Sequence, residues 1–100
     1  MREEKGGIAV KLKNYMEDLV LARIDKVLAQ YPQCCRCEQC RLDIMALALN
    51  RLPPRYISSH KGDVFTRIEE MNGVYDVEVI KALIKAVELV HAHPRHERDV

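Results

Sequence analysis

The sequence predicts an all-α, mainly helical protein: a small compact domain of about four helices with a cysteine-rich loop. Apolar residues recur at three- and four-residue steps in several stretches, which is the period of an amphipathic helix. Prolines and an Asn-Gly pair separate these stretches, and four cysteines crowd into positions 34–40. With 100 residues, 48% of them hydrophobic, the chain fits one domain over 1–100 and leaves no room for a second core.

The first predicted helix runs from Ile8 to Tyr31. Its apolar face comprises Ile8, Leu12, Tyr15, Met16, Leu19, Val20, Ile24, Val27, Leu28 and Tyr31. Pro32 is expected to end it, because proline has no backbone N–H and disfavours helix in the residue before it.

Two shorter helices are predicted in the middle of the chain. Strong helix formers from Leu42 to Leu49 predict a mostly buried second helix that stops before Pro53-Pro54. A brief extended or turn segment follows over 56–59. Asp63 can then cap a third helix, which Asn72-Gly73 terminates. That helix carries Val64, Phe65, Ile68 and Met71.

The fourth predicted helix begins at Asp76, a candidate N-cap, and ends before Pro94. Its predicted apolar face comprises Val77, Ile80, Leu83, Ile84, Val87 and Val90. The polar tail over 94–100 is expected to fray.

Charge and hydropathy exclude several classes of protein. The N-terminus is charged and no long apolar stretch follows it, so we expect no signal peptide or membrane span and a cytoplasmic location. The net charge is only +1, which argues against a general nucleic-acid binder. The middle third, residues 32–67, has 6 basic and 3 acidic side chains, so a small phosphorylated ligand could bind there.

The cysteine cluster is the clearest chemical signal. Cys35, Cys37 and Cys40 follow a C-x-C-x2-C spacing that lets one turn and the start of a helix present three sulfurs to one ion. In a reducing cytosol such spacing favours a metal over disulfides, and thiolates favour Zn. Cys34 is the first candidate for the fourth ligand, although adjacent cysteines point in different directions. A histidine, a carboxylate, water or a partner subunit could supply that ligand instead.

Other interpretations of the cysteines and histidines are open. The cysteines could be free or buried structural thiols or, less in keeping with the spacing, ligands of an iron–sulfur cluster. Cys37-x-x-Cys40 also has the spacing of a thioredoxin-type redox motif, but no strand-helix-strand unit is predicted to carry it. His91, His93 and His96 are spaced two and three apart, and we interpret them as a solvated tail.

One longer segment resembles a known family. The string Asp43-Ile44-Met45-Ala46-Leu47-Ala48-Leu49-Asn50-Arg51-Leu52-Pro53-Pro54-Arg55-Tyr56 follows the three-cysteine spacing. An N-x-M-E-x-x-V pattern occurs upstream, on the first helix, at 14–20. This combination, over 14 to about 62, resembles the ComFB family of late competence development proteins.

The resemblance implies a small helical fold, often a homodimer, with zinc held by the cysteines. Other members of the family look like receptors for bacterial cyclic dinucleotides, which implies a basic site with stacking and base-edge partners. The residue types fit such a ligand, since guanidinium and ammonium groups bind phosphates and an aromatic ring stacks on a purine. The candidate ligand-binding residues are Asn14, Glu17, Arg51, Arg55, Tyr56, Lys61 and Arg67.

Two functions therefore compete. The first is a zinc-binding regulatory protein that recognises cyclic di-GMP or cyclic di-AMP and passes its state to an unknown protein partner. The second is a structural, zinc-stapled protein–protein adaptor of the competence system with no small-molecule ligand. We expect no enzyme, because Ser58, Ser59 and His60 form no recognised catalytic arrangement.

Overall fold

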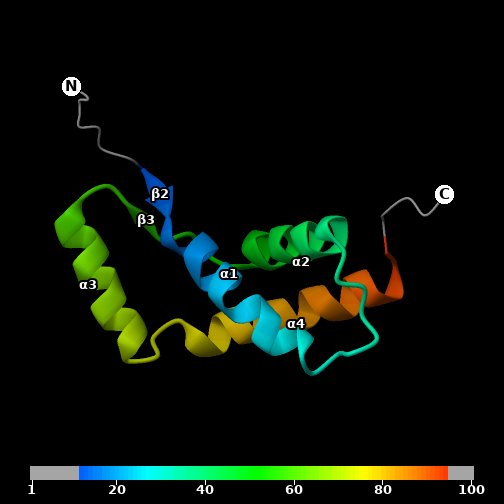
Figure 1. Cartoon of the computed structure of the whole chain (residues 1–100). Coiled ribbons are helices and arrows are strands. Elements are labelled where there is room, and N and C mark those ends of the chain that lie inside the picture. The colour runs from blue at the N-terminus through cyan, green and yellow to red at the C-terminus, as the bar shows by residue number, and fades with distance from the viewer. Residues whose placement is uncertain (1–11, 95–100) are drawn as a thin grey trace.

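The computed structural model describes residues 12–94 and has four helices and one short strand pair (Figure 1). The helices are α1 (Tyr15–Leu28), α2 (Glu38–Arg51), α3 (His60–Met71) and α4 (Asp76–Ala92). Strands β2 (Lys13–Asn14) and β3 (Tyr56–Ile57) pair antiparallel. The predicted mainly helical class with a cysteine-rich loop is confirmed.

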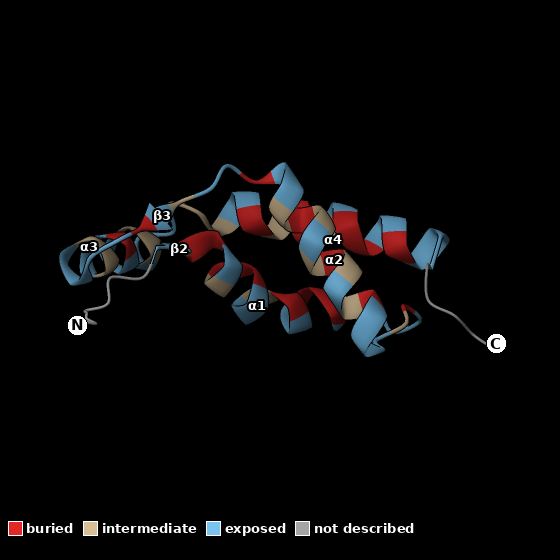
Figure 2. Ribbon diagram, turned by 90° about the horizontal axis from the view of Figure 1, so that it is seen from above, coloured by how far each residue is buried: buried red, intermediate tan, exposed pale blue. Residues whose placement is uncertain are grey.

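Helices α1, α2 and α4 form the body of the molecule. Helix α4 packs along both α2 and α1, and the buried faces of the three helices turn toward one another (Figure 2). Ile24, Ile44 and Leu83 each bring a fully buried side chain to this core from a different helix. Their burial supplies the main driving force for folding.

Helix α3 stands apart from this body, at the opposite end from the cysteine loop (Figure 1). Thr66 is its one buried residue, and Phe65, Ile68 and Met71 are exposed. Polar contacts tie it back: Arg55 bonds Thr66 and Glu69, and Tyr75 bonds Glu69 at 2.9 Å. A twelve-residue helix is marginal in water without burial of an apolar face.

The first helix is shorter than predicted. Ile8 lies outside the described residues, and a helix through Lys13 and Asn14 is wrong, because these residues pair with β3. The side chain of Asn14 accepts a hydrogen bond from the Met16 N–H at 3.2 Å and so caps α1. At its other end, turns carry the chain from Leu28 to Tyr31, just before Pro32.

The middle helices also differ in detail. Helix α2 begins at Glu38, before the predicted Leu42, because Cys37 caps it. The prediction that this helix is mostly buried is wrong, since Cys40, Ile44 and Ala48 are its only buried residues.

The caps of the last two helices differ from prediction as well. Ser59, not Asp63, caps α3. Asn72-Gly73 does end that helix, with Gly73 at φ 76°. Tyr75, not Asp76, is the N-cap of α4, and it makes no side-chain cap bond.

The buried face of α4 is shifted from the predicted one. Val77 is exposed, and the helix buries Val79, Ala82, Leu83, Ala86, Val87 and Val90. Small alanines on this face let α4 approach both α1 and α2 closely. Within 12–94 no helix has the length and hydrophobicity needed to cross a membrane.

Candidate metal centre

The cysteine loop lies between the end of α1 and the start of α2. Cys37 is in an extended conformation, and its Sγ accepts a hydrogen bond from the Cys40 N–H at 3.4 Å, as the N-cap of α2. Cys40 is in the first turn of that helix and is fully buried, while Cys35 comes from the preceding loop. A loop and a helix start therefore supply sulfurs to one point, as the spacing predicted.

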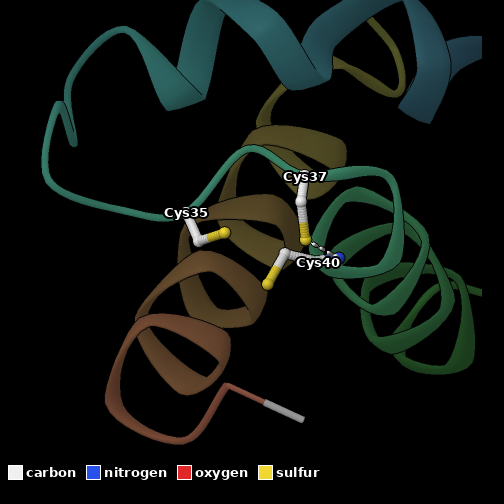
Figure 3. A group of neighbouring side chains, drawn as sticks. All are labelled: Cys35, Cys37 and Cys40. Atoms are coloured by element: carbon white, nitrogen blue, oxygen red, sulfur yellow. Dashed lines mark hydrogen bonds between the residues drawn. The ribbon is translucent and has the colours of Figure 1, made fainter. Parts of the chain in front are cut away.

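The three sulfurs converge (Figure 3). The Sγ atoms of Cys35, Cys37 and Cys40 all lie within 4.8 Å of one another. Zinc–sulfur bonds of about 2.3 Å in a tetrahedron separate the sulfurs by about 3.8 Å, so small side-chain movements would bring all three onto one ion. The donor set and its geometry fit a thiolate-bound metal ion.

The local electrostatics differ among the three thiols. The Cys40 backbone N–H, donating to the Cys37 sulfur, lowers the pKa of the Cys37 thiol. Burial beside the other two sulfurs raises the pKa of Cys40 to about 12. Three neighbouring thiolates repel one another, and a divalent cation would remove that repulsion by binding all of them.

Cys34 is not part of this group. It is buried, and its Sγ donates to the carbonyl oxygen of Cys35 at 3.6 Å. It lines a separate cavity of about 240 Å³ together with Tyr31 and His91. Burial raises the pKa of its thiol, as it does for Cys40, so it is the position of its sulfur outside the group of three that sets Cys34 apart.

Arg36 holds the loop in place, a role that sequence reasoning missed. Its guanidinium donates to the carbonyl oxygens of Cys34 at 3.1 Å, of Tyr31 and Pro32 at 3.4 Å each, and of Leu28. These carbonyls lie at the end of α1 and in the loop after it, where those of Leu28 and Tyr31 also accept from the Tyr31 and Cys34 N–H groups at 2.9 and 3.0 Å. Arg36 lies between the candidate ligands Cys35 and Cys37, and its hydrogen bonds anchor this part of the loop to the end of α1.

Three of the predicted nucleotide-binding residues have structural roles. Asn14 Oδ1 accepts from the Arg55 N–H at 2.8 Å as well as from Met16, so it ties β3 to α1. The Arg55 guanidinium bonds Thr66 and Glu69 at 3.2 Å each. Arg67 bonds Asp63 and lies 5.2 Å over the Tyr15 ring.

The other four predicted residues are exposed and separated. Glu17 lies on the solvent side of α1, and Tyr56 is 60% exposed on β3. Arg51 lines a cavity of about 320 Å³ between α2 and α4, whereas Lys61 lines a different one beside α3. A shared nucleotide pocket for all seven residues remains a prediction.

Comparisons with known proteins agree with the sequence motifs. The family model for the late competence development protein ComFB matches residues 13–94. The competence protein ComFB of Bacillus subtilis (strain 168) is 25% identical over 83 residues, covering 83% of this chain and 85% of that protein. The solved structure of the late competence protein ComFB from Bacillus subtilis superposes with a TM-score of 0.73 at 25% identity, covering 85% of this chain and 93% of the solved one.

Proposed function

The chain belongs to the ComFB family of late competence development proteins, and we propose that it is a zinc-stapled regulatory adaptor without catalytic activity. In this proposal zinc holds the cysteine loop, and the helical surfaces bind other proteins. The observation that carries it is the convergence of the Cys35, Cys37 and Cys40 sulfurs within 4.8 Å.

Zinc is the metal that the donors favour. Three thiolates on one loop and helix start are typical of structural zinc sites, whose metal contributes directly to folding free energy. Cys35, Cys37 and Cys40 would hold the ion, and water, a second chain or another side chain would supply the fourth ligand. Since Cys35 lies in the loop and Cys40 in the first turn of α2, the metal would fix the loop against the start of α2.

A non-catalytic role agrees with the contacts of Ser59 and His60, two of the residues considered above as possible catalytic groups. The Ser59 hydroxyl accepts a hydrogen bond from the Gly62 N–H at 3.0 Å, so it serves as the cap of α3. His60 is the first residue of that helix and is exposed. A nucleophile requires a base within hydrogen-bond reach, and these contacts supply a helix cap instead.

Metal analysis and chelation test the zinc assignment. We expect about one zinc per chain in the purified protein, and a lower melting temperature after chelation. Cys35→Ser or Cys40→Ser should abolish retention, while Cys34→Ser should keep it. Protein that carries no stoichiometric metal and melts unchanged after chelation would remove the proposal.

We assign a second copy of this chain to the apolar face of α3. Val64, Phe65, Ile68 and Met71 are spaced along one side of the helix and are 44% to 81% exposed. Together they form a continuous apolar stripe along the exposed side of α3, and such contiguous apolar surface often marks a protein–protein interface. A net charge of +1 opposes self-association little, and α3 would gain from a second copy the burial that residues 12–94 do not provide.

Sedimentation tests this homodimer. We expect a dimer that Ile68→Glu dissociates, because a buried unpaired carboxylate in the interface is costly. Leu21→Glu is the matched control, since Leu21 is 56% exposed on α1, a different helix. A species of only 11.6 kDa at working concentrations would exclude the homodimer.

The cyclic dinucleotide receptor is the second candidate, and one cavity favours it. Arg51, Lys81 and Lys85 line the cavity of about 320 Å³ between α2 and α4, with Glu78 as the one acid. Among the described residues none of these three cations has an ion-pair partner, so their charge is available to an oxyanion. The cavity is large enough for a phosphate and part of a base.

Calorimetric titration of the metal-loaded protein with cyclic di-GMP and cyclic di-AMP separates the two candidates. Saturable binding that is lost in an Arg51→Ala, Lys85→Ala variant and kept in a Lys26→Ala control would favour the receptor. Lys26 is an exposed cation on α1, away from the cavity. Absence of binding would leave the adaptor.

A further inference from the structure

The two cysteines at the start of α2 have a C-x-x-C spacing. Cys37 is the N-cap of the helix, and Cys40 is in its first turn. Their sulfurs lie within 4.8 Å of each other, and the Cys40 N–H donates a hydrogen bond to the Cys37 sulfur (Figure 3). One helical turn therefore holds two thiols side by side, an arrangement that suits exchange between a dithiol and a disulfide.

These two thiols differ in exposure. Cys37 is exposed, whereas Cys40 is fully buried. An oxidant dissolved in water can therefore reach Cys37, and the Cys40 N–H stabilises negative charge on the Cys37 sulfur. Cys40 is shielded from the oxidant but lies next to Cys37, which is the position of a resolving cysteine.

The other two cysteines are less suited to the same reaction. Cys34 is buried, and its sulfur lies outside the group of three. Cys35 is close enough, but it belongs to the loop that the Arg36 hydrogen bonds hold against α1. Disulfide sulfurs are about 2.05 Å apart, much closer than two ligands of one metal ion, so a bond to Cys35 would have to move that loop. Cys37 and Cys40 can close within a single turn.

We propose that Cys37 and Cys40 form a reversible disulfide when the protein meets a hydroperoxide, and that this oxidation releases the metal. The release of metal rests on the zinc staple proposed above, whereas the disulfide does not. Zinc binds thiolates, and the disulfide removes two of the three, so that only Cys35 remains. The cysteine loop is then no longer fixed against the start of α2.

Hydrogen peroxide can supply the oxidising equivalents. The Cys37 thiolate attacks one peroxide oxygen, so that an S–O bond forms, the O–O bond breaks, and hydroxide leaves and takes up the proton that the thiol gave up. The Cys40 sulfur then attacks the Cys37 sulfur: the S–S bond forms, the S–O bond breaks, and hydroxide leaves with the Cys40 proton as water. The two thiols lose two electrons, and one peroxide becomes two molecules of water.

Peptide mapping of the zinc-loaded full chain after peroxide treatment and alkylation tests the disulfide. Trypsin cleaves after Arg36 and Arg41, so residues 37–41 form one peptide that contains Cys37 and Cys40 but not Cys35. We expect this peptide to be unalkylated and lighter by two hydrogen atoms, and dithiothreitol should reverse the change. Two peptides joined by a disulfide, or a 37–41 peptide without an internal disulfide, would overturn the proposal.

Single substitutions identify the reacting pair. Cys34→Ser and Cys35→Ser should both still give the 37–41 disulfide, because neither changes a reacting sulfur. Cys40→Ser should leave Cys37 as a sulfenic acid that dimedone traps. A folded Cys40→Ser chain without this adduct would contradict the role of Cys37. If Cys40→Ser does not fold, Cys35→Ser decides, since its failure to form the disulfide would contradict the pairing.

A metal-binding dye in the same reaction follows zinc. We expect about one zinc released for each disulfide formed. A disulfide that forms while zinc stays bound would refute the release. Protein that is purified without zinc but forms the disulfide would refute the zinc staple and leave the oxidation site standing. Zinc-loaded protein that forms no disulfide would refute the oxidation site alone.

Discussion

Replacing Arg36 with methionine would remove the contacts that hold the cysteine loop. The guanidinium reaches four backbone carbonyls, but two of the bonds are 3.4 Å long and contribute little. The bonds to Cys34 and Leu28 remain. Hydrogen bonds from a charged donor contribute up to about 3 kcal/mol each, but Arg36 is exposed and water would replace it, so we expect a loss of about 1–2 kcal/mol in total.

That loss is measurable in two ways. For a domain of this size, 1 kcal/mol corresponds to about 4–8 °C, so the melting temperature should fall by about 5–15 °C. A loop that is less ordered before binding should also lower zinc affinity about tenfold, the equivalent of about 1.4 kcal/mol. Thermal denaturation and a competitive chelator titration measure the two effects.

The control is Arg51→Met, which removes the same charge from an exposed arginine whose side chain makes no hydrogen bond or ion pair with residues 12–94. Its melting temperature should stay within about 3 °C of the parent. Arg36→Lys should lie between the parent and Arg36→Met, because an ammonium reaches fewer carbonyls. Unchanged stability and zinc affinity in Arg36→Met would refute the anchoring role.

Three further substitutions test the fold by urea denaturation. Leu83→Ala should lower the free energy of unfolding by about 2–5 kcal/mol, because the side chain is fully buried. Val77→Ala should change it by no more than about 0.5 kcal/mol, because Val77 is exposed. Equal effects of the two substitutions would contradict the arrangement of α4. Asn14→Ala should lower the free energy of unfolding by about 1–2 kcal/mol, since it removes the cap of α1 and leaves the Arg55 N–H without its partner. Unchanged stability would contradict the role of these two hydrogen bonds. Gly73→Ala should cost about 1 kcal/mol through its φ of 76° alone, because a Cβ there meets no atom within 4 Å, and a stabilised variant would contradict this.

Local sequence signals predicted the features that depend on neighbouring residues. The 3.6-residue period located the four helices, Asn72-Gly73 ended the third, and the cysteine spacing brought three sulfurs together. Helix starts were predicted less well, since several residues competed as caps. Ser59 and Asp63 both suit an N-cap, and only the extended conformation of Ser59 decides between them.

Features that depend on distant residues could not be predicted in this way. Asn14 leaves the helical pattern because it pairs with Tyr56, 42 positions along the chain, and nothing near Asn14 reports that partner. Arg36 resembles any other basic loop residue until the end of α1 lies beside it. The apolar pattern of α3 predicts an amphipathic helix but not that its apolar face lies outside the core of its own chain.

X-ray absorption at the zinc edge tests the central claim most directly, because it counts the sulfur atoms around the metal. Three sulfurs at about 2.3 Å with one lighter ligand are predicted, and the count should be the same in Cys34→Ser. A shell of nitrogen and oxygen alone, or a sulfur count that falls when Cys34 is replaced, would contradict a metal centre built from Cys35, Cys37 and Cys40.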